Sequence, residues 1–269
     1  MESVFKDASP KMILFDFMGT CLDWHTPMIP VLTSAFETAS KSYGSKPPNR
    51  EHISAFALRW RQGFFDEVAA RSKQDLPLED IDVTHRRVLD GLLKEESSQN
   101  GWTSGMRDEC VQQWHKQVAW PDVITALPKL RKQFDIVVLA NGTPRLQVDL
   151  AKHSGLEFDL LLSSELLGLG KPDLKAYERA VQLMKRDAEE CVMVAAHAYD
   201  LRAAKKVGIK TVYLQRWTED PTEDMPAVNS DVDYFIDGRG AVSERGGMED
   251  VVKLLGCSSL KRTRDAISN

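Results

Sequence analysis

Four short polar motifs contain the residue types that covalent catalysis requires. Each follows an apolar run, and their sequences are FDFMGT at 15–20, ANGTP at 140–144, GKPD at 170–173 and HAYD at 197–200. An aspartate such as Asp16 can attack carbon or phosphorus and form an ester intermediate. A lysine such as Lys171 would keep that acid ionised and offset the negative charge that develops during the reaction. These motifs therefore predict a covalent site, provided that the fold brings them together.

The elements around the motifs predict that they share one edge of a sheet. Short apolar runs typical of buried strands lie at 11–17, 135–141, 159–163, 191–197, 210–214 and 232–236. Helical patterns lie between them, at 122–134, 144–153, 173–184 and 200–207. This alternation indicates a parallel sheet with right-handed crossovers, and such folds bind ligands at the carboxyl ends of the strands. Each motif alone is also typical of a turn or a helix start, so the prediction depends on the ordered set.

One region interrupts the alternation. Residues 23–117 contain no convincing strand, and helical patterns occupy 27–43, 50–70, 76–94 and 106–118. The predicted fold class is therefore α/β, with a Rossmann-like, doubly wound parallel sheet core and an inserted helical cap domain. We expect residues 1–21 and 118–269 to form the core and residues 22–117 to form the cap.

The composition narrows the functional classes. The chain has 269 residues, with 35 basic and 40 acidic side chains and a net charge of −5, which disfavours a nucleic-acid binder. No apolar run approaches the roughly 20 residues of a membrane helix. The four cysteines are far apart and form no CxxC pair, which favours a reducing compartment. We therefore expect a cytoplasmic protein whose polar ends, 1–11 and 258–269, are tails.

The motifs FDFMGT, LANGTP, GKPDLKAY and VAAHAYDLRAA resemble the haloacid dehalogenase superfamily, and within it the type II 2-haloacid dehalogenase group. The resemblance extends over residues 11–255 and includes the cap after the first motif. It implies a hydrolase in which Asp16 displaces halide from a small 2-haloacid-like substrate, after which water hydrolyses the ester. It is less specific for the substrate than for the fold, because one fold hosts many reactions.

The resemblance also implies a role for each matching residue. In the catalytic set, Thr20 would orient Asp16, Lys171 would pair with it, and Asp200 would hold the lysine. From the cap, Arg61 would clamp an anion, although a solvated cap arginine is an equal alternative. The substrate-binding set that we expect comprises Phe17, Met18, Arg61, Gln62, Asn141, Tyr177 and Tyr199.

Several positions depart from the family patterns. Met18 stands where the superfamily's phosphatases carry a second aspartate, and Ala195 and Ala196 thin the acid cluster before Asp200. We therefore expect no metal and no cofactor. Ala140 and Ala195 stand where the familiar dehalogenases have serines, and His197 where they have an asparagine. His197 is either a general base, which completes the catalytic set, or a residue that only shapes the pocket.

Two alternatives to a dehalogenase remain open. One is a Mg²⁺-dependent phosphatase-type hydrolase, and the other is a family member retuned for another transformation of a larger apolar substrate. The cap aromatics Trp24, Trp60, Phe64 and Phe65 would suit an apolar substrate, but they would equally pack the cap core. The resemblance to dimeric family members also implies that the chain can form a homodimer.

Overall fold

The computed structural model describes residues 10–74, 76–77, 79–96, 98 and 100–257. Of the ends that we expected to be tails, 1–11 and 258–269, residues 1–9 and 258–269 lie outside these residues. Lys11 is described, and its backbone N–H donates to the carbonyl oxygen of Glu190 at 2.8 Å, so the expected tail was wrong at this residue.

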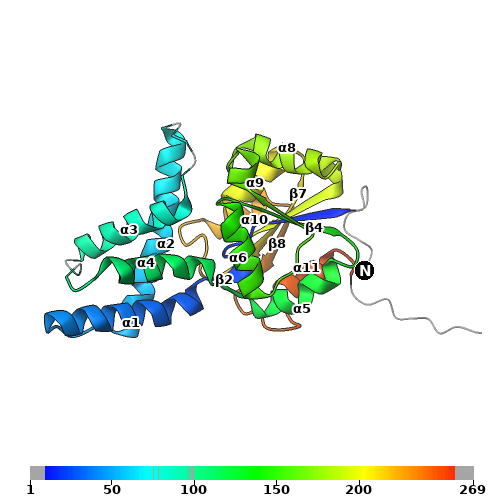
Figure 1. Ribbon diagram of the computed structural model, residues 1–269. Coiled ribbons are helices and arrows are strands. Elements are labelled where there is room, and N and C mark those ends of the chain that lie inside the picture. The colour runs from blue at the N-terminus through cyan, green and yellow to red at the C-terminus, as the bar shows by residue number, and fades with distance from the viewer. Residues whose placement is uncertain (1–9, 75, 78, 97, 99, 258–269) are drawn as a thin grey trace, which may run out of the picture.

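A six-stranded parallel sheet forms the centre of the core, as the sequence predicted (Figure 1). Its strands are β1 (Met12–Phe15), β4 (Asp135–Ala140), β5 (Leu160–Ser163), β6 (Cys191–Ala195), β7 (Lys210–Gln215) and β8 (Tyr234–Asp237). Their order is β5-β4-β1-β6-β7-β8. The chain thus fills one side of β1 and then crosses to the other, so the strand order reverses beside β1. In doubly wound folds, this reversal is where ligands bind.

Helices cover both faces of the sheet, because the strand residues are apolar on both sides. Ile13 and Phe15 pack on one face and Met12 and Leu14 on the other, as the alternation of side chains in a strand requires. The first face is covered by α5 (Pro121–Leu130), α6 (Pro144–Ser154) and α11 (Met248–Leu254). The second is covered by α8 (Leu174–Leu183), α9 (Ala198–Lys206) and α10 (Met225–Asp231). Short turns of helix complete the core at α7 (Ser164–Leu167) and η2 (Ala188–Glu190).

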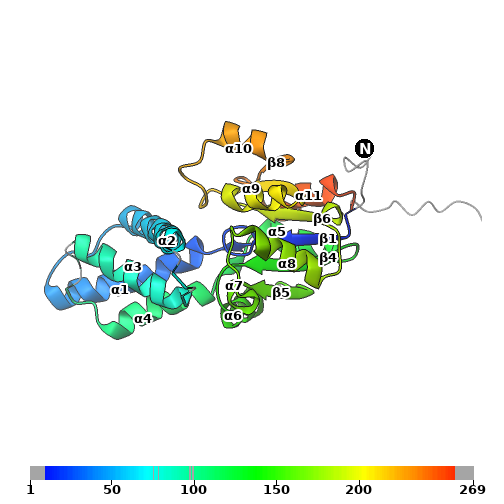
Figure 2. The same ribbon diagram turned by 90° about the horizontal axis from the view of Figure 1, so that it is seen from above.

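Four helices between the first and second strands of the sheet form a separate lobe beside it (Figures 1 and 2). They are α1 (His25–Tyr43), α2 (Arg50–Lys73), α3 (Ile81–Glu95) and α4 (Ser104–Gln112), followed by the turn η1 (Gln113–His115). The helix α3 begins later than the predicted residue 76, because the Asp80 side chain caps it by accepting from the backbone N–H of Asp82 at 3.0 Å. Trp24 and Trp60 are buried in the core of this lobe, so they pack the cap and do not form an exposed surface for an apolar substrate.

A small antiparallel ladder connects the lobe to the core. It pairs β2 (Leu22–Asp23) with β3 (Val118–Ala119). The expectation of no strand within 23–117 was wrong only at Asp23, because a two-residue strand is too short to produce a periodic signal. The ladder lies where the chain leaves the core for the helical lobe and where it returns. On this basis, we propose that residues 1–21 and 118–269 form the core domain and residues 22–117 form the cap domain.

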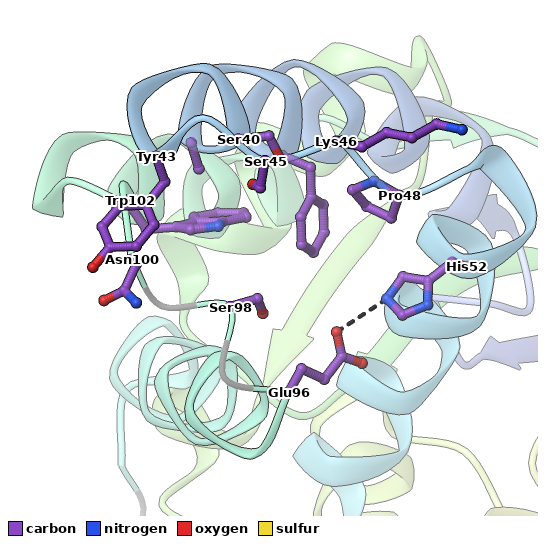
Figure 3. Close-up of a pocket in the computed structure, with 12 residues that line it drawn as sticks. Ser40, Tyr43, Ser45, Lys46, Pro48, His52, Glu96, Ser98, Asn100 and Trp102 are labelled. Carbon is purple, nitrogen blue, oxygen red and sulfur yellow. Dashed lines mark hydrogen bonds and ion pairs between the residues drawn. The ribbon is translucent and has the colours of Figure 1, made fainter.

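The lobe also contains an open hollow of about 600 Å³ at the end of α1 that lies away from the sheet (Figure 3). Phe36, Trp102 and the His52–Glu96 pair are among the residues that line it. None of the predicted site residues does so.

In the described part of the chain, no helix is long and apolar enough to span a membrane.

Candidate active site

Asp16 lies immediately after β1, at the carboxyl edge of the sheet. Its Oδ2 accepts a hydrogen bond from Thr20 Oγ1 at 2.7 Å, and its Oδ1 accepts from Lys171 Nζ at 2.8 Å. The Thr20 oxygen itself accepts from the backbone N–H of Ala196 at 2.8 Å, so its own proton is directed at Asp16. Burial raises the pKa of Asp16, but Lys171 and His197 outweigh it and hold the pKa well below the ordinary value. Asp16 is therefore an oriented, ionised carboxylate.

A second acid anchors the lysine. Lys171 Nζ also donates to Asp200 Oδ2, and Tyr177 OH donates to Asp200 Oδ1 at 2.5 Å. Burial lowers the pKa of Lys171, but Asp16 and Asp200 outweigh it and raise the pKa above its ordinary value. The lysine thus remains charged at neutral pH and bridges the two predicted acids.

Asn141 holds the loop that carries the lysine. Its Oδ1 accepts from the backbone N–H of Lys171 at 2.8 Å, and its Nδ2 donates to the backbone carbonyl of Lys171 at 3.0 Å. Thr143 caps the next helix, α6, by accepting from the N–H of Leu146 at 3.1 Å. The predicted amide therefore lies in the site, where it fixes the lysine backbone.

His197 lies between two carboxylates. Its Nδ1 is 3.0 Å from Asp16 Oδ2, and its Nε2 is 2.7 Å from Oε2 of Glu219. Burial lowers the pKa of His197, but the two carboxylates outweigh it and raise the pKa to about 10. While Asp16 is ionised, His197 is an imidazolium that donates from both nitrogens.

Sequence reasoning missed Glu219. It follows β7 in the segment RWTED at 216–220, so it lies after a fifth strand end of the kind that marked the other motifs. Its side chain has no exposed surface. Oε1 accepts from Trp24 Nε1 at 2.6 Å and from Thr218 Oγ1 at 2.8 Å, and Oε2 accepts from Arg61 Nη2 at 3.1 Å. Burial raises the pKa of Glu219, but Arg61 and His197 outweigh it and lower the pKa to about 2.

Arg61 of α2 reaches the site from the cap, and its side chain is buried, so it is not a solvated arginine. Besides Glu219, its Nη2 contacts the carbonyl oxygen of Met18 at 3.3 Å, and its guanidinium lies 4.5 Å from the centre of the Phe65 ring. Its Nε is buried and has no partner among the described residues. One donor of Arg61 therefore stays available for a ligand, although the charge of the guanidinium is matched by Glu219.

A buried ion pair fixes the loop that carries Glu219. Arg216 donates to both carboxylate oxygens of Asp122 at 3.1 and 2.9 Å, and its Nε donates to the carbonyl oxygen of Thr20 at 3.2 Å. The guanidinium also lies 5.0 Å from the Trp120 ring centre. This planar, bidentate contact holds the loops after β1 and β7 in one arrangement.

The remaining predicted substrate residues lie at different distances from the chemistry. Phe17 is buried in the core and packs edge-on against Phe158, with ring centres 5.1 Å apart. The Tyr199 ring centre lies 5.7 Å from that of His197, so Tyr199 lines the site. Met18 is partly buried between the core and the cap lobe. Gln62 donates to Asp66 at 2.9 Å along the exposed side of α2, and this bond does not involve the site.

The residues around Asp16 do not fit a divalent cation. Lys171 and the His197 imidazolium both donate to its oxygens, so positive charge already surrounds the carboxylate. Met18 offers no acid, and the described residues contain no group of three or more His, Cys, Asp or Glu side chains arranged to hold a metal. A hard cation binds oxygen ligands, and the carboxylates of Asp16, Asp200 and Glu219 are already bound by donors from Lys171, His197, Tyr177 and Arg61. The site can instead deliver an ionised carboxylate to an electrophile that lies beside the rings of Phe65 and Tyr199 and the buried His197.

A family model and several similar proteins of known name assign the chain to the same family. Residues 10–208 match a family model described as a haloacid dehalogenase-like hydrolase. The (S)-2-haloacid dehalogenase 4A of Burkholderia cepacia is 24% identical over 216 residues, which are 79% of this chain and 86% of that protein. The (S)-2-haloacid dehalogenase of Pseudomonas sp. (strain YL) is 26% identical over 211 residues, 77% of this chain and 83% of that protein. A phosphoglycolate phosphatase of Chromobacterium violaceum is 26% identical over 210 residues, 75% of this chain and 83% of that protein.

Solved structures are similar along most of the chain. The crystal structure of an L-2-haloacid dehalogenase has a TM-score of 0.74 at 28% identity and covers 93% of this chain and 100% of its own. That of a defluorinating L-2-haloacid dehalogenase has a TM-score of 0.75 at 25% identity and covers 95% of this chain and 98% of its own.

Proposed function

Because the chain belongs to the haloacid dehalogenase-like hydrolases, we propose that it hydrolyses a small 2-haloacid-like substrate through an ester formed on Asp16. The two relatives named (S)-2-haloacid dehalogenase, each matched over most of this chain, support this substrate class. The phosphatase relative makes phosphate-ester cleavage the competing reaction.

The residues around Asp16 favour carbon–halogen cleavage over phosphate-ester cleavage. In the superfamily's phosphatases, an acid two residues after the nucleophile protonates the leaving alkoxide, and Met18 has no proton to give. A halide leaves as a stable anion and needs no such proton. Lys171 and His197 surround the carboxylate with positive charge, which suits displacement of an anion and opposes the binding of Mg²⁺.

In the first half of the proposed reaction, a carboxylate oxygen of Asp16 attacks the α-carbon. A carbon–oxygen bond forms, and the carbon–halogen bond breaks with its electron pair on the halide. Thr20 and Lys171 hold the carboxylate in one orientation, which lowers the entropic cost of the attack. The buried Nε–H of Arg61 is the donor that we assign to the departing halide.

In the second half, water hydrolyses the ester and a base must take its proton. His197 is the candidate base, because its Nδ1 lies 3.0 Å from Asp16 Oδ2, beside the carbon that water attacks. The alternative is that His197 only shapes the pocket.

A substrate screen tests the proposal. Halide and phosphate release would be measured from a panel of 2-haloacids and phosphate monoesters, each with Mg²⁺ and with EDTA. We expect halide release that survives EDTA, and we expect Asp16→Asn to abolish it while the protein stays folded, as circular dichroism would show. Mass spectrometry of the trapped protein should find the acid ester on the peptide that contains Asp16. Phosphate release that requires Mg²⁺ would contradict the proposal.

A further inference from the structure

The imidazole of His197 is held at both ends by buried carboxylates. Asp16 contacts Nδ1 and Glu219 contacts Nε2, at 3.0 and 2.7 Å. The side chains of His197 and Glu219 are 3% and 0% exposed, so water does not compete for these bonds. The ring therefore has one fixed orientation, in which Nδ1 faces the nucleophile and Nε2 faces away from it.

We propose that Glu219 is the positioning residue for water activation: it holds the Nε2–H of His197 so that Nδ1 faces the Asp16 ester and takes the proton of the attacking water. The inference depends on the proposed function, because it requires an ester on Asp16. It assigns to Glu219 the part that a buried acid has beside a catalytic histidine, which is to fix the tautomer and to stabilise the imidazolium.

Formation of the ester changes the charge that His197 meets. In the free enzyme, Asp16 and Glu219 are both anionic and the ring is an imidazolium. Once Asp16 is esterified, it no longer carries the charge that held the proton on Nδ1. That proton passes to solvent as the halide leaves, and Nδ1 becomes an acceptor while Nε2–H stays bonded to Glu219.

The hydrolysis step then balances. Water forms a bond to the Asp16 carbonyl carbon, and one water proton passes to Nδ1. The tetrahedral carbon then expels the substrate oxygen, which takes the proton from Nδ1 and leaves as a hydroxy acid. Asp16 is left as a carboxylic acid, and its proton moves to His197. The carboxylate and the imidazolium of the free enzyme are thereby restored.

Several charged or titratable groups lie around His197, and of these Asp16 and Glu219 raise its pKa. The groups are Asp16 after β1, Lys171 beside Asp16, Glu219 and Asp220 after β7, Tyr199 on α9 and, through Glu219, Arg61 of α2. Among the described residues, only Asp16 and Glu219 form hydrogen bonds to the ring itself. Asp220 instead accepts from the N–H of Ala198 at 2.7 Å, which makes it a matched control.

Glu219 also links the cap to this histidine. Its two oxygens accept from Arg61 and Trp24, which lie before or within the cap helices, while Oε2 is shared with His197. A purely structural role would be to neutralise Arg61. The two roles of Glu219 affect different steps. Neutralising Arg61 would affect ester formation, in which the halide leaves, whereas positioning His197 would affect hydrolysis of the ester.

Single-turnover kinetics of Glu219→Gln separate these roles, with 2-chloropropionate as the probe. Ester formation and decay would be followed by intact-protein mass spectrometry in the wild type, Glu219→Gln and the control Asp220→Asn. We expect ester to form in Glu219→Gln and to decay at least about 10-fold more slowly than in the wild type, because general-base catalysis contributes about 10²–10⁴-fold. Asp220→Asn should keep the wild-type ratio of decay to formation.

Two outcomes would overturn the inference and are distinguishable. If the wild type forms ester on Asp16 and Glu219→Gln hydrolyses it at the wild-type rate, only the role of Glu219 fails. If the wild type forms no ester with any 2-haloacid, the proposed function fails and the inference fails with it. A ¹⁵N NMR titration of His197 gives a second measurement, made on samples whose amide spectra show that the variant is folded. The ring should deprotonate at lower pH in Glu219→Gln than in the wild type, and an unchanged titration would contradict the pairing.

Discussion

Gly19 and Glu219 are packed so closely that an ideal Cβ atom on Gly19 would lie 2.3 Å from Cδ of Glu219. Gly19 has a φ of +85°, which side chains rarely tolerate. Glu219 cannot move away freely, because Arg61, Trp24 and His197 all bind its carboxylate. The glycine after the nucleophile therefore makes room for the acid that follows β7.

We expect Gly19→Ala to lower the free energy of unfolding by about 2–5 kcal/mol, combining left-handed backbone strain with overpacking. Chemical denaturation measures the loss. Gly155→Ala is the control, because Gly155 also has a positive φ, +70°, but no described heavy atom lies within 4 Å of its ideal Cβ. Gly155→Ala should cost only the backbone strain, about 1–2 kcal/mol. Equal losses in the two variants would contradict the close packing of Gly19 against Glu219.

Removing one partner of the buried Arg216–Asp122 pair should cost far more stability than removing one partner of a surface pair. The two side chains are 2% and 0% exposed, and removal of one partner leaves a charge buried without compensation. We expect Arg216→Met to lower the free energy of unfolding by about 3–5 kcal/mol. Arg131→Met, which breaks the exposed pair with Asp159, should cause a much smaller loss. Similar urea midpoints for the two variants would argue against a structural role for the buried pair.

The fold was predictable because its signals are local and repeated. Six apolar runs gave the six parallel strands, and the rule that ligands bind at carboxyl strand ends brought Asp16, Lys171, His197 and Asp200 together. Thr20 lies four residues from Asp16, so its contact follows from the local turn.

The part of the site that escaped prediction depends on tertiary contacts. Glu219 lies in a stretch that resembles a solvated loop, and only the assembled fold buries it against Arg61, which is 158 residues away in sequence. The strand-end rule applied to β7 would have marked its segment, although not its partners. The role of Asn141 was equally inaccessible, because its amide binds the backbone of a residue 30 positions later.

The ion pairs of His197 predict a pH dependence of stability. In the folded protein, the pKa of His197 is raised to about 10 by Asp16 and Glu219, which outweigh the effect of burial, whereas its ordinary value is 6.5. A raised pKa means that the stabilisation is fully present below pH 6.5 and is lost as the pH rises through about 10. Between pH 6.5 and 10, the wild type should therefore lose free energy of unfolding relative to His197→Asn, which cannot titrate at this position. Denaturant unfolding at several pH values measures the difference, and parallel profiles would contradict the assignment.

The same variant tests whether His197 is the base of the second half-reaction. Water must lose a proton to hydrolyse the ester, and Nδ1 lies within hydrogen-bond distance of the nucleophile. Asparagine keeps a similar polar shape but cannot accept that proton at neutral pH. We therefore expect His197→Asn to slow ester hydrolysis more than ester formation, by about 10²-fold or more, so that the adduct on Asp16 accumulates in a single turnover. If His197 only shapes the pocket, the variant should bind substrate somewhat less tightly and accumulate no adduct. Normal turnover without accumulated ester would remove His197 as the base, and with it the partner through which Glu219 is proposed to act.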